Sequence, residues 1–348
     1  MIRTLDVFFK VLRNGAELTR LLPNESSAPI LRMKSDGGIP TALSGAFAVN
    51  REVNWLTDEL EPTLVIDGIE HKLGRYLPAT VQETRTTASR YVQVEAYDRA
   101  WRVRDTYTQT MLYFEAGTNY LDAVKRLLYE CGISQIRETD TEETLPTARQ
   151  GWLAGTSYLD IVNQLLNEIN YKNLWFDSSG SAVLEPSLIP SAVTIQHTLN
   201  ADDVRSLLLP QLFRTSDIYN APNSFTCVSS TPDLNAPLVA TAENTNPQSP
   251  LSIMRRGRRI STVVSVPNIA SQAALQLYAN RLLFESMTRG ETLTVSTGLL
   301  PGYGVNEITA LHYEDLTALC RETGWTMELK PGGTMTHTLE RMVYNIEL

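Results

Sequence analysis

The sequence has few of the residues that build redox and metal sites. Its 348 residues include only three cysteines and four histidines. The cysteines (Cys131, Cys227 and Cys320) show no CxxC spacing, and the histidines form no HxxxH pair. We therefore expect no disulfide framework, no metal site and no cofactor. Cys131 ends an apolar helical stripe, which predicts a buried thiol.

Long apolar runs are also missing. No stretch approaches the roughly eighteen apolar residues that a membrane-spanning helix needs. The first segment, residues 1–12, carries Arg3, Asp6 and Lys10 among its apolar residues, which does not fit a signal peptide. We therefore expect no membrane insertion. The lack of a disulfide framework fits synthesis in a reducing compartment.

Motifs for covalent catalysis and nucleotide binding are absent too. The chain contains neither a GxSxG nucleophile elbow nor a GxxxxGK[ST] phosphate loop. Its net charge of −9 disfavours a protein that grips nucleic acid, because phosphate contacts need clustered Lys and Arg. The same balance permits a surface past which nucleic acid slides without binding.

The first hundred or so residues have the pattern of strands joined by tight turns. Residues 64–66 and the run from Ile69 flank an Asp67-Gly68 pair, which predicts a two-residue hairpin with left-handed turn backbone. Residues 91–97 alternate in polarity, which predicts a half-buried strand. Strands spaced by short turns indicate a barrel or a sandwich.

The middle of the chain contains an internal repeat. Residues 116–133 (AGTNYLDAVKRLLYECGI) and 154–171 (AGTSYLDIVNQLLNEINY) are identical at ten of eighteen positions, with an offset of 38 residues. Their apolar positions match and follow the 3.6-residue period of a helix. Asn119 and Ser157 stand where N-caps accept hydrogen bonds from first-turn amides. The repeat predicts two equivalent amphipathic helices, and two copies are too few for a solenoid.

Strand patterns return after residue 211, interrupted by one helix at 269–289. The residues expected to face inward on this helix are Ala273, Leu277, Phe284 and Met287. The predicted fold class is α+β and β-rich, with three domains because the chain is too long for one ordinary domain. These are a first β domain at 1–112, an α+β middle domain with the helix repeat at 113–207, and a second β domain with one long helix at 208–348.

The densest charge cluster consists of Arg255, Arg256, Arg258 and Arg259. In an otherwise acidic chain, such a cluster favours contact with an acidic partner surface, and we predict that it lies at a subunit interface. A solvated turn before the next strand is the simpler alternative. Nucleic-acid binding ranks third, because no aromatic residues alternate with the arginines.

Two acidic stretches are the candidates for an enzyme site. Residues 312–315 join His312 to two carboxylates, and Asp140, Glu142 and Glu143 have the residue types of a glycosidase pair. Neither stretch has an evident catalytic partner, so polar surface is the favoured interpretation of both. We predict no catalytic residue and keep a cell-wall (peptidoglycan) hydrolase as the alternative function.

A carbohydrate-binding module is a third possibility, which would need aromatic side chains on an exposed face. The five tryptophans are scattered along the sequence instead, which favours core positions: Trp55, Trp101, Trp152, Trp175 and Trp325.

Three segments resemble tail hub proteins of contractile-tailed phages, of prophages and of related injection devices. They are the hairpin Val65-Ile66-Asp67-Gly68 with the following Leu73-Gly74-Arg75-Tyr76, the strand Val94-Glu95-Ala96-Tyr97-Asp98-Arg99, and the Gly155–Pro186 passage with its Leu-Trp-Phe-Asp element. The resemblance spans most of the chain in the order of the family.

The resemblance implies a homotrimer in which each subunit carries two tail-tube-like β-barrel domains. Three subunits then form a pseudo-sixfold ring with an axial channel, between the hexameric tail tube and the threefold central spike. The implied partners are the chain itself, the tail tube protein, the spike, and other baseplate and tape-measure proteins, while DNA passes through without specific binding. The implied location is the baseplate of a virion tail assembled in the host cytoplasm. Some members carry lysozyme or peptidase modules; this sequence ends in a predicted strand, so we expect none.

Overall fold

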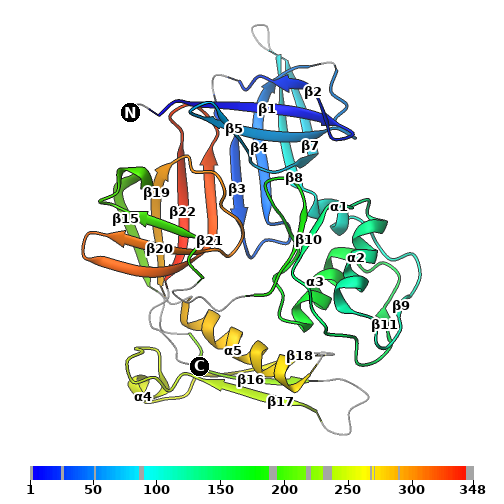
Figure 1. Ribbon diagram of the computed structural model, residues 1–348, viewed down its shortest axis with the longest axis vertical. Helices are drawn as coiled ribbons and strands as arrows, with labels where there is room; N and C mark the ends of the chain where they lie inside the picture. Colours follow the sequence, from blue (N-terminus) through cyan, green and yellow to red (C-terminus); the bar gives the residue numbers. More distant parts are fainter. Residues whose placement is uncertain are drawn as a thin grey trace.

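The computed structural model describes the chain between residues 3 and 341 with short gaps. The described residues are 3–24, 27–50, 52–85, 90–187, 194–216, 221–229, 237–266, 269, 271–288 and 291–341. Within these ranges the chain forms four sheets and five α-helices (Figure 1). No helix in these ranges combines the length and apolar character needed to cross a membrane.

The largest sheet has fourteen strands and takes them from both ends of the chain. The N-terminal strands are β1 (Leu5–Arg13), β2 (Ala16–Leu21), β3 (Ile30–Lys34), β4 (Thr41–Ala48), β5 (Glu59–Ile66), β6 (Ile69–Lys72), β7 (Tyr76–Arg85) and β8 (Arg90–Asp98). The C-terminal strands are β14 (His197–Asn200), β15 (Leu208–Ser216), β19 (Glu291–Gly298), β20 (Ile308–Tyr313), β21 (Leu316–Glu328) and β22 (Thr334–Arg341). A short 3-10 helix, η2 (Val204–Ser206), precedes β15.

Two units of this sheet have the same pairing order. In the N-unit, β3 pairs with β4, β4 with β8, β8 with β7, β7 with β5 and β5 with β1. In the C-unit, β15 pairs with β19, β19 with β22, β22 with β21, β21 with β20 and β20 with β14. All these pairs are antiparallel except β14 with β20, which is parallel. The two strand-rich ends of the chain therefore repeat one pairing order, and only the counterparts β1 and β14 differ in direction.

The equivalent strands β7 and β21 also share a bulge at the same place. In β7 the pairing to β8 skips from Pro78 to Thr80, and in β21 the pairing to β22 skips from Glu322 to Gly324. One extra residue in each strand therefore faces a single partner residue, which increases the local twist. The shared bulge fixes the alignment of the two units residue by residue.

Strands β21 and β3 pair antiparallel and join the C-unit to the N-unit; we call this pairing the internal joint. Trp325 stands opposite Met33, and Met327 stands opposite Leu31. The backbones approach closely, since a Cβ on Gly324 would lie 3.2 Å from the carbonyl oxygen of Met33. The strands of the two units therefore form one sheet in which no closed barrel is found among the described residues, so the two β-barrel domains implied by the resemblance are not confirmed.

Local predictions for the N-unit are confirmed. Asp67 and Gly68 have φ values of 49° and 82°, the left-handed backbone that the two-residue turn between β5 and β6 requires. On β8, Val92, Val94 and Ala96 are buried while the intervening residues are not. Alternation and turn chemistry in the sequence therefore determine this hairpin and this strand.

The middle unit contains the two copies of the sequence repeat. Its elements are α1 (Ala100–Arg104), β9 (Leu112–Phe114), α2 (Tyr120–Glu130), β10 (Ile136–Glu138), β11 (Arg149–Trp152), α3 (Tyr158–Glu168), β12 (Trp175–Phe176) and β13 (Ala182–Leu184). The predicted N-caps are confirmed: Asn119 Oδ1 accepts from the Leu121 amide at 2.8 Å, and Ser157 Oγ accepts from the Leu159 amide at 3.3 Å. The buried faces of both helices share one apolar core.

A smaller unit is inserted between β15 and β19. It consists of β16 (Ser224–Ser229), β17 (Val239–Glu243), α4 (Ile253–Arg256), β18 (Ser261–Val266) and α5 (Gln272–Thr288), which lies along the three strands (Figure 1). Of the residues expected to face inward on α5, Phe284 and Met287 are buried, but Ala273 and Leu277 are exposed. Apolar residues surround this helix on several sides, so its periodicity does not define one face. Residue 289, the expected end, lies outside the described residues.

Candidate functional site

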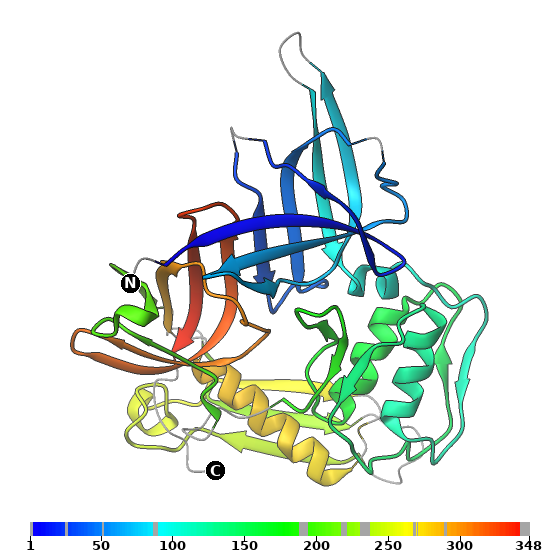
Figure 2. The ribbon, with the colours of Figure 1, turned by 45° about the horizontal axis from the view of Figure 1, so that its top comes forward.

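The wall, which we define as the strands β15-β19-β22-β21-β3-β4-β8-β7, has an open edge at each end. At one end, β15 pairs with β19 alone among the described strands, and its residues 209–216 are exposed except for half-buried Leu212. At the other end, β7 meets β5 only at Tyr76, and the β7–β8 hairpin extends beyond the rest of the sheet (Figure 2). Unpaired N–H and C=O groups on such edges favour pairing with a further strand.

The two faces of the wall differ in chemistry. On β19, Leu293 and Val295 are buried, whereas Thr294 and Ser296 point to the opposite face. Threonines of β22 continue this second face, which we call the polar face. Ser296 Oγ lies 3.3 Å from Thr336 Oγ1 on it, and two ion pairs join Arg321 to Glu340 at 2.7 Å and Arg32 to Glu95 at 3.4 Å. The polar face is therefore hydroxyl-rich, and several of its charges form opposite-sign pairs.

Two histidine–carboxylate pairs lie around Tyr303 in the C-unit. His337 Nδ1 is 2.6 Å from Glu322 Oε1, and both side chains are fully buried. His197 Nε2 is 2.7 Å from Glu307 Oε2. The Tyr303 ring stacks on His197 at 3.8 Å and lies 5.0 Å from His337. Sequence spacing gives no sign of this cluster because its members come from separate segments; it ties β14 and the β19–β20 loop to β21 and β22.

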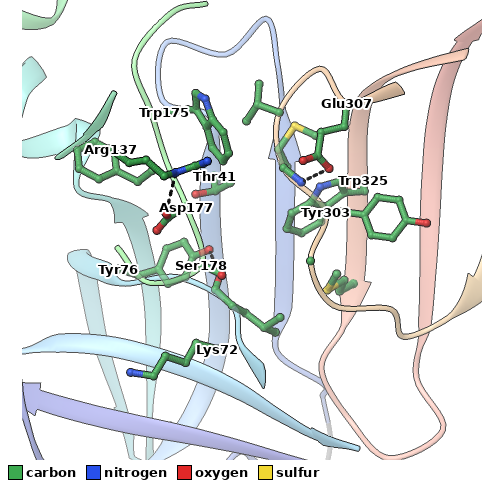
Figure 3. A pocket seen from close by; sticks show the side chains of 17 residues that line it. Thr41, Lys72, Tyr76, Arg137, Trp175, Asp177, Ser178, Tyr303, Glu307 and Trp325 are labelled. Atoms are coloured by element: carbon green, nitrogen blue, oxygen red, sulfur yellow. Dashed lines mark hydrogen bonds and ion pairs between the residues drawn. The ribbon is translucent and has the colours of Figure 1, made fainter. Parts of the chain in front are cut away.

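A cavity of about 270 Å³ lies where the internal joint meets the middle unit (Figure 3). Trp325 of the wall and Trp175 of the middle unit both line it and belong to one buried cluster. Arg137 and Asp177 form an ion pair of 3.7 Å at its side (Figure 3). The buried cluster holds the middle unit against the wall, while the ion pair lies within the middle unit. Like Trp152, both tryptophans are buried, while Trp55 and Trp101 are half-buried, so no tryptophan forms the exposed platform that a carbohydrate-binding module needs.

The two acidic stretches considered as enzyme sites lie on different elements of the structure. Asp140, Glu142 and Glu143 are exposed, and the backbone of their loop accepts hydrogen bonds at the start of α2, including one from Tyr120 N to Glu143 O at 3.2 Å. His312 lies on β20 with Nδ1 3.3 Å from Thr317 Oγ1. The structure does not bring the two stretches together.

Asp98 is a buried carboxylate that no catalytic or binding motif in the sequence indicates. Asp98 ends β8 and accepts hydrogen bonds from Thr41 N, Thr41 Oγ1 and Ala100 N, at 2.9, 2.7 and 2.9 Å. Burial raises the pKa of Asp98 to about 6, against the lowering effect of these hydrogen bonds. Its oxygens are occupied by the first residue of β4 and by the start of α1, so its role is to fix the end of the wall to the middle unit.

The arginine cluster lies at the end of the small unit near α4. Arg256 Nη1 donates to the Ala221 carbonyl at 2.9 Å, and Arg255 Nε donates to the Pro247 carbonyl at 2.8 Å. Arg259 forms an ion pair of 2.9 Å with Glu243, and Arg258 is exposed. Three of the four arginines therefore support the local fold, and a subunit contact through this cluster stays a prediction.

The described part of the chain contains no group of three or more His, Cys, Asp or Glu residues placed to hold a metal ion. The three cysteines are free and buried, as predicted for Cys131.

No protein-family model matches the chain, and no curated protein sequence matches it. Solved structures do. A tail protein from Neisseria meningitidis is 16% identical with a TM-score of 0.69, and 96% of each chain is covered. The 43 kDa tail protein of prophage MuSo2 from Shewanella oneidensis is 9% identical with a TM-score of 0.67, covering 98% of this chain and 99% of that chain. The chain has the fold of phage tail proteins. A prophage tail protein from Listeria monocytogenes shares this fold at 11% identity and a TM-score of 0.60, covering 96% of this chain and 94% of that chain.

The tail-protein fold covers the whole architecture described above. Because the matches extend over nearly the full length of both chains, the wall, the middle unit and the small unit all belong to the shared fold.

Proposed function

We propose that the protein is the structural hub of a phage-type tail baseplate, a homotrimeric adaptor between the hexameric tail tube and the threefold spike. The observation that carries the proposal is the repeated pairing order of the N-unit and the C-unit. Three copies present six topologically equivalent units, so one molecule can offer sixfold contacts to a tube and threefold contacts to a spike. Cyclic assembly also covers the open edges of the wall.

The polar face supports an axial channel. In a closed ring, the face opposite the apolar core can line the lumen without exposing hydrophobic surface, and here that face carries hydroxyls and paired charges. A surface without clustered Lys and Arg gives little counterion-release affinity for DNA, so the nucleic acid passes without specific binding. The net charge of −9 is in line with this role.

The proposal places the protein in the baseplate of a virion tail assembled in the host cytoplasm. Its partners are a further two copies of itself, the tail tube protein, the central spike, and other baseplate and tape-measure proteins. The chain divides as 1–112, 113–207 and 208–348, with α1 of the first segment packing in the core of the middle unit and β14 at the end of the middle segment completing the C-unit. The two tube-like domains then form curved walls that close into a barrel only in the trimer.

The test is the oligomeric state and shape of the purified protein, alone and with its tail tube protein. We expect a trimer by light scattering and threefold rings in negative-stain images. A monodisperse monomer that never associates with tube protein would overturn the hub function. Zymography separates the hydrolase alternative, because clear lysis of peptidoglycan would replace the structural role with an enzymatic one.

A further inference from the structure

We infer that copies of the chain join by antiparallel pairing of β7 of one copy with β15 of the next, in the register of the internal joint. The inference rests on the proposed trimer and adds to it the strands, the register and the residues that form the contact.

The internal joint shows how one unit binds another. It pairs β21, which follows the shared bulge in the C-unit, with β3, the outermost strand of the N-unit. The strand equivalent to β21 is β7, and the strand equivalent to β3 is β15. Both are the open edges of the wall. Repeating the internal joint between copies therefore pairs β7 with β15, and in the proposed trimer this head-to-tail contact closes into a ring.

The register follows from the pairings of each unit. Beyond the bulge, Met327 of β21 corresponds to Glu83 of β7. Leu31 faces Leu43 in the N-unit, and Arg214 faces Leu293 at the equivalent place in the C-unit. Arg214 of β15 therefore corresponds to Leu31 of β3. Because Met327 stands opposite Leu31 in the internal joint, Glu83 stands opposite Arg214 between copies. Opposite charges at directly facing positions favour the antiparallel pair.

The neighbouring positions support the same register. It places Thr84 opposite Phe213 and Val81 opposite Ser216, so two apolar side chains that are 59% and 38% exposed, Phe213 and Val81, enter the contact. Ile30, the counterpart of Phe213 in the internal joint, is also apolar. Exposed apolar residues on both edges are explained by one contact.

The surroundings of the two edges are complementary in charge. At the end of the β7–β8 hairpin, Arg85 and Arg90 are both ion-paired with Glu83. Beside β15 lies a hollow of about 570 Å³, whose charged lining residues are Arg214, Arg341, Glu314 and Asp315. The register brings the arginine-rich hairpin end towards this hollow, where the carboxylates of Glu314 and Asp315 are exposed. Because each edge complements the other on the same chain, the occupant is a second copy of the chain.

The test uses a disulfide across the inferred joint. In the internal joint, Ser35 N donates to Thr323 O and Leu329 N donates to Pro29 O, so Ser35 with Thr323 and Pro29 with Leu329 are hydrogen-bonded pairs. Because hydrogen-bonded and non-hydrogen-bonded pairs alternate along the ladder, Thr326 with Arg32 is a non-hydrogen-bonded pair. The equivalent non-hydrogen-bonded pair between copies is Gln82 with Thr215. Such pairs have Cα atoms about 4.5 Å apart, within disulfide range. The native cysteines are buried and do not compete.

In the variant carrying Gln82→Cys and Thr215→Cys, mild oxidation is expected to give a covalent trimer in denaturing gels that reductant returns to monomer. The matched control pairs Gln82→Cys with Gln211→Cys, an exposed position on the same strand about 13 Å further along, and is expected to stay largely uncrosslinked.

A trimer of the unmodified protein without this crosslink overturns the joint and leaves the hub function standing. A crosslink that gives only open chains longer than trimers supports the joint and overturns the threefold ring. Absence of both trimer and crosslink overturns both. Equal crosslinking in the control overturns the register.

Discussion

Asp98 Oδ2 accepts hydrogen bonds from both the backbone amide and the hydroxyl of Thr41, at 2.9 and 2.7 Å, inside the protein core. Within the described part of the chain, the donors to this carboxylate are the neutral groups of Thr41 and Ala100, so its charged form relies on neutral donors.

This environment predicts a pH-dependent stability. Since burial raises the folded-state pKa of Asp98 to about 6, above its unfolded value, its contribution is fully present below about pH 4 and is lost as the pH rises through 6. Urea unfolding at pH 4.5 and 7.5 is the measurement. The fall in unfolding free energy between these values is expected to be about 2 kcal/mol larger in the wild type than in Asp98→Asn. Equal falls in both proteins would contradict the assignment.

The buried pair of Glu322 and His337 predicts strong coupling. Glu322→Leu alone leaves His337 Nδ1 and the Thr309 hydroxyl without their acceptor and is expected to cost about 3–5 kcal/mol of stability. The variant with both residues changed to Leu is expected to be more stable than the sum of the single changes predicts, by at least about 1 kcal/mol. Denaturant unfolding of all four proteins gives this difference, and strict additivity would show that the pair does not act as a unit.

The exposed carboxylates of Glu314 and Asp315 beside β15 predict a charge-dependent association. Glu314→Arg with Asp315→Arg is expected to weaken the trimer about tenfold, because reversing two exposed charges costs roughly 1–2 kcal/mol at the contact. Analytical ultracentrifugation measures the change, and Arg85→Glu with Arg90→Glu is expected to restore part of it. Reversal of exposed Glu142 and Glu143 in the middle unit is the matched control and is expected to leave association unchanged. An equal loss in the control would point to net charge instead of the joint.

The arginine cluster predicts two separate effects. Arg256→Ala removes a hydrogen bond to the Ala221 carbonyl and is expected to lower the stability of the monomer by about 1 kcal/mol. Arg258 is exposed, so Arg258→Ala is expected to leave the melting temperature unchanged and to weaken subunit association. Association of Arg258→Ala at the wild-type level would remove the cluster from the interface and leave it as a solvated turn.

Much of the local structure follows from the sequence. The Asp67-Gly68 hairpin and the caps of α2 and α3 depend on backbone conformation and first-turn amides, which neighbouring residues determine. On α5, the prediction is confirmed for Phe284 and Met287 and wrong for Ala273 and Leu277. Apolar residues lie on several sides of this helix, so contact with the neighbouring sheet determines which of them are buried. The arginine cluster is the densest group of charges in the sequence, which favours an interface, but three of its four side chains form hydrogen bonds or an ion pair within the small unit.

The continuous wall could not be read from the sequence. Met33 meets Trp325, and His197 meets Tyr303, only because segments far apart in the sequence pair. The polarity pattern of a strand shows which side chains are buried but does not identify the strand with which it pairs. Composition, strand alternation and the helix repeat by themselves determined a β-rich chain with a helical middle. Only the tertiary structure decided that its two ends share one sheet and one pairing order, because every strand edge carries the same backbone donors and acceptors and the pattern of one strand does not name its partner.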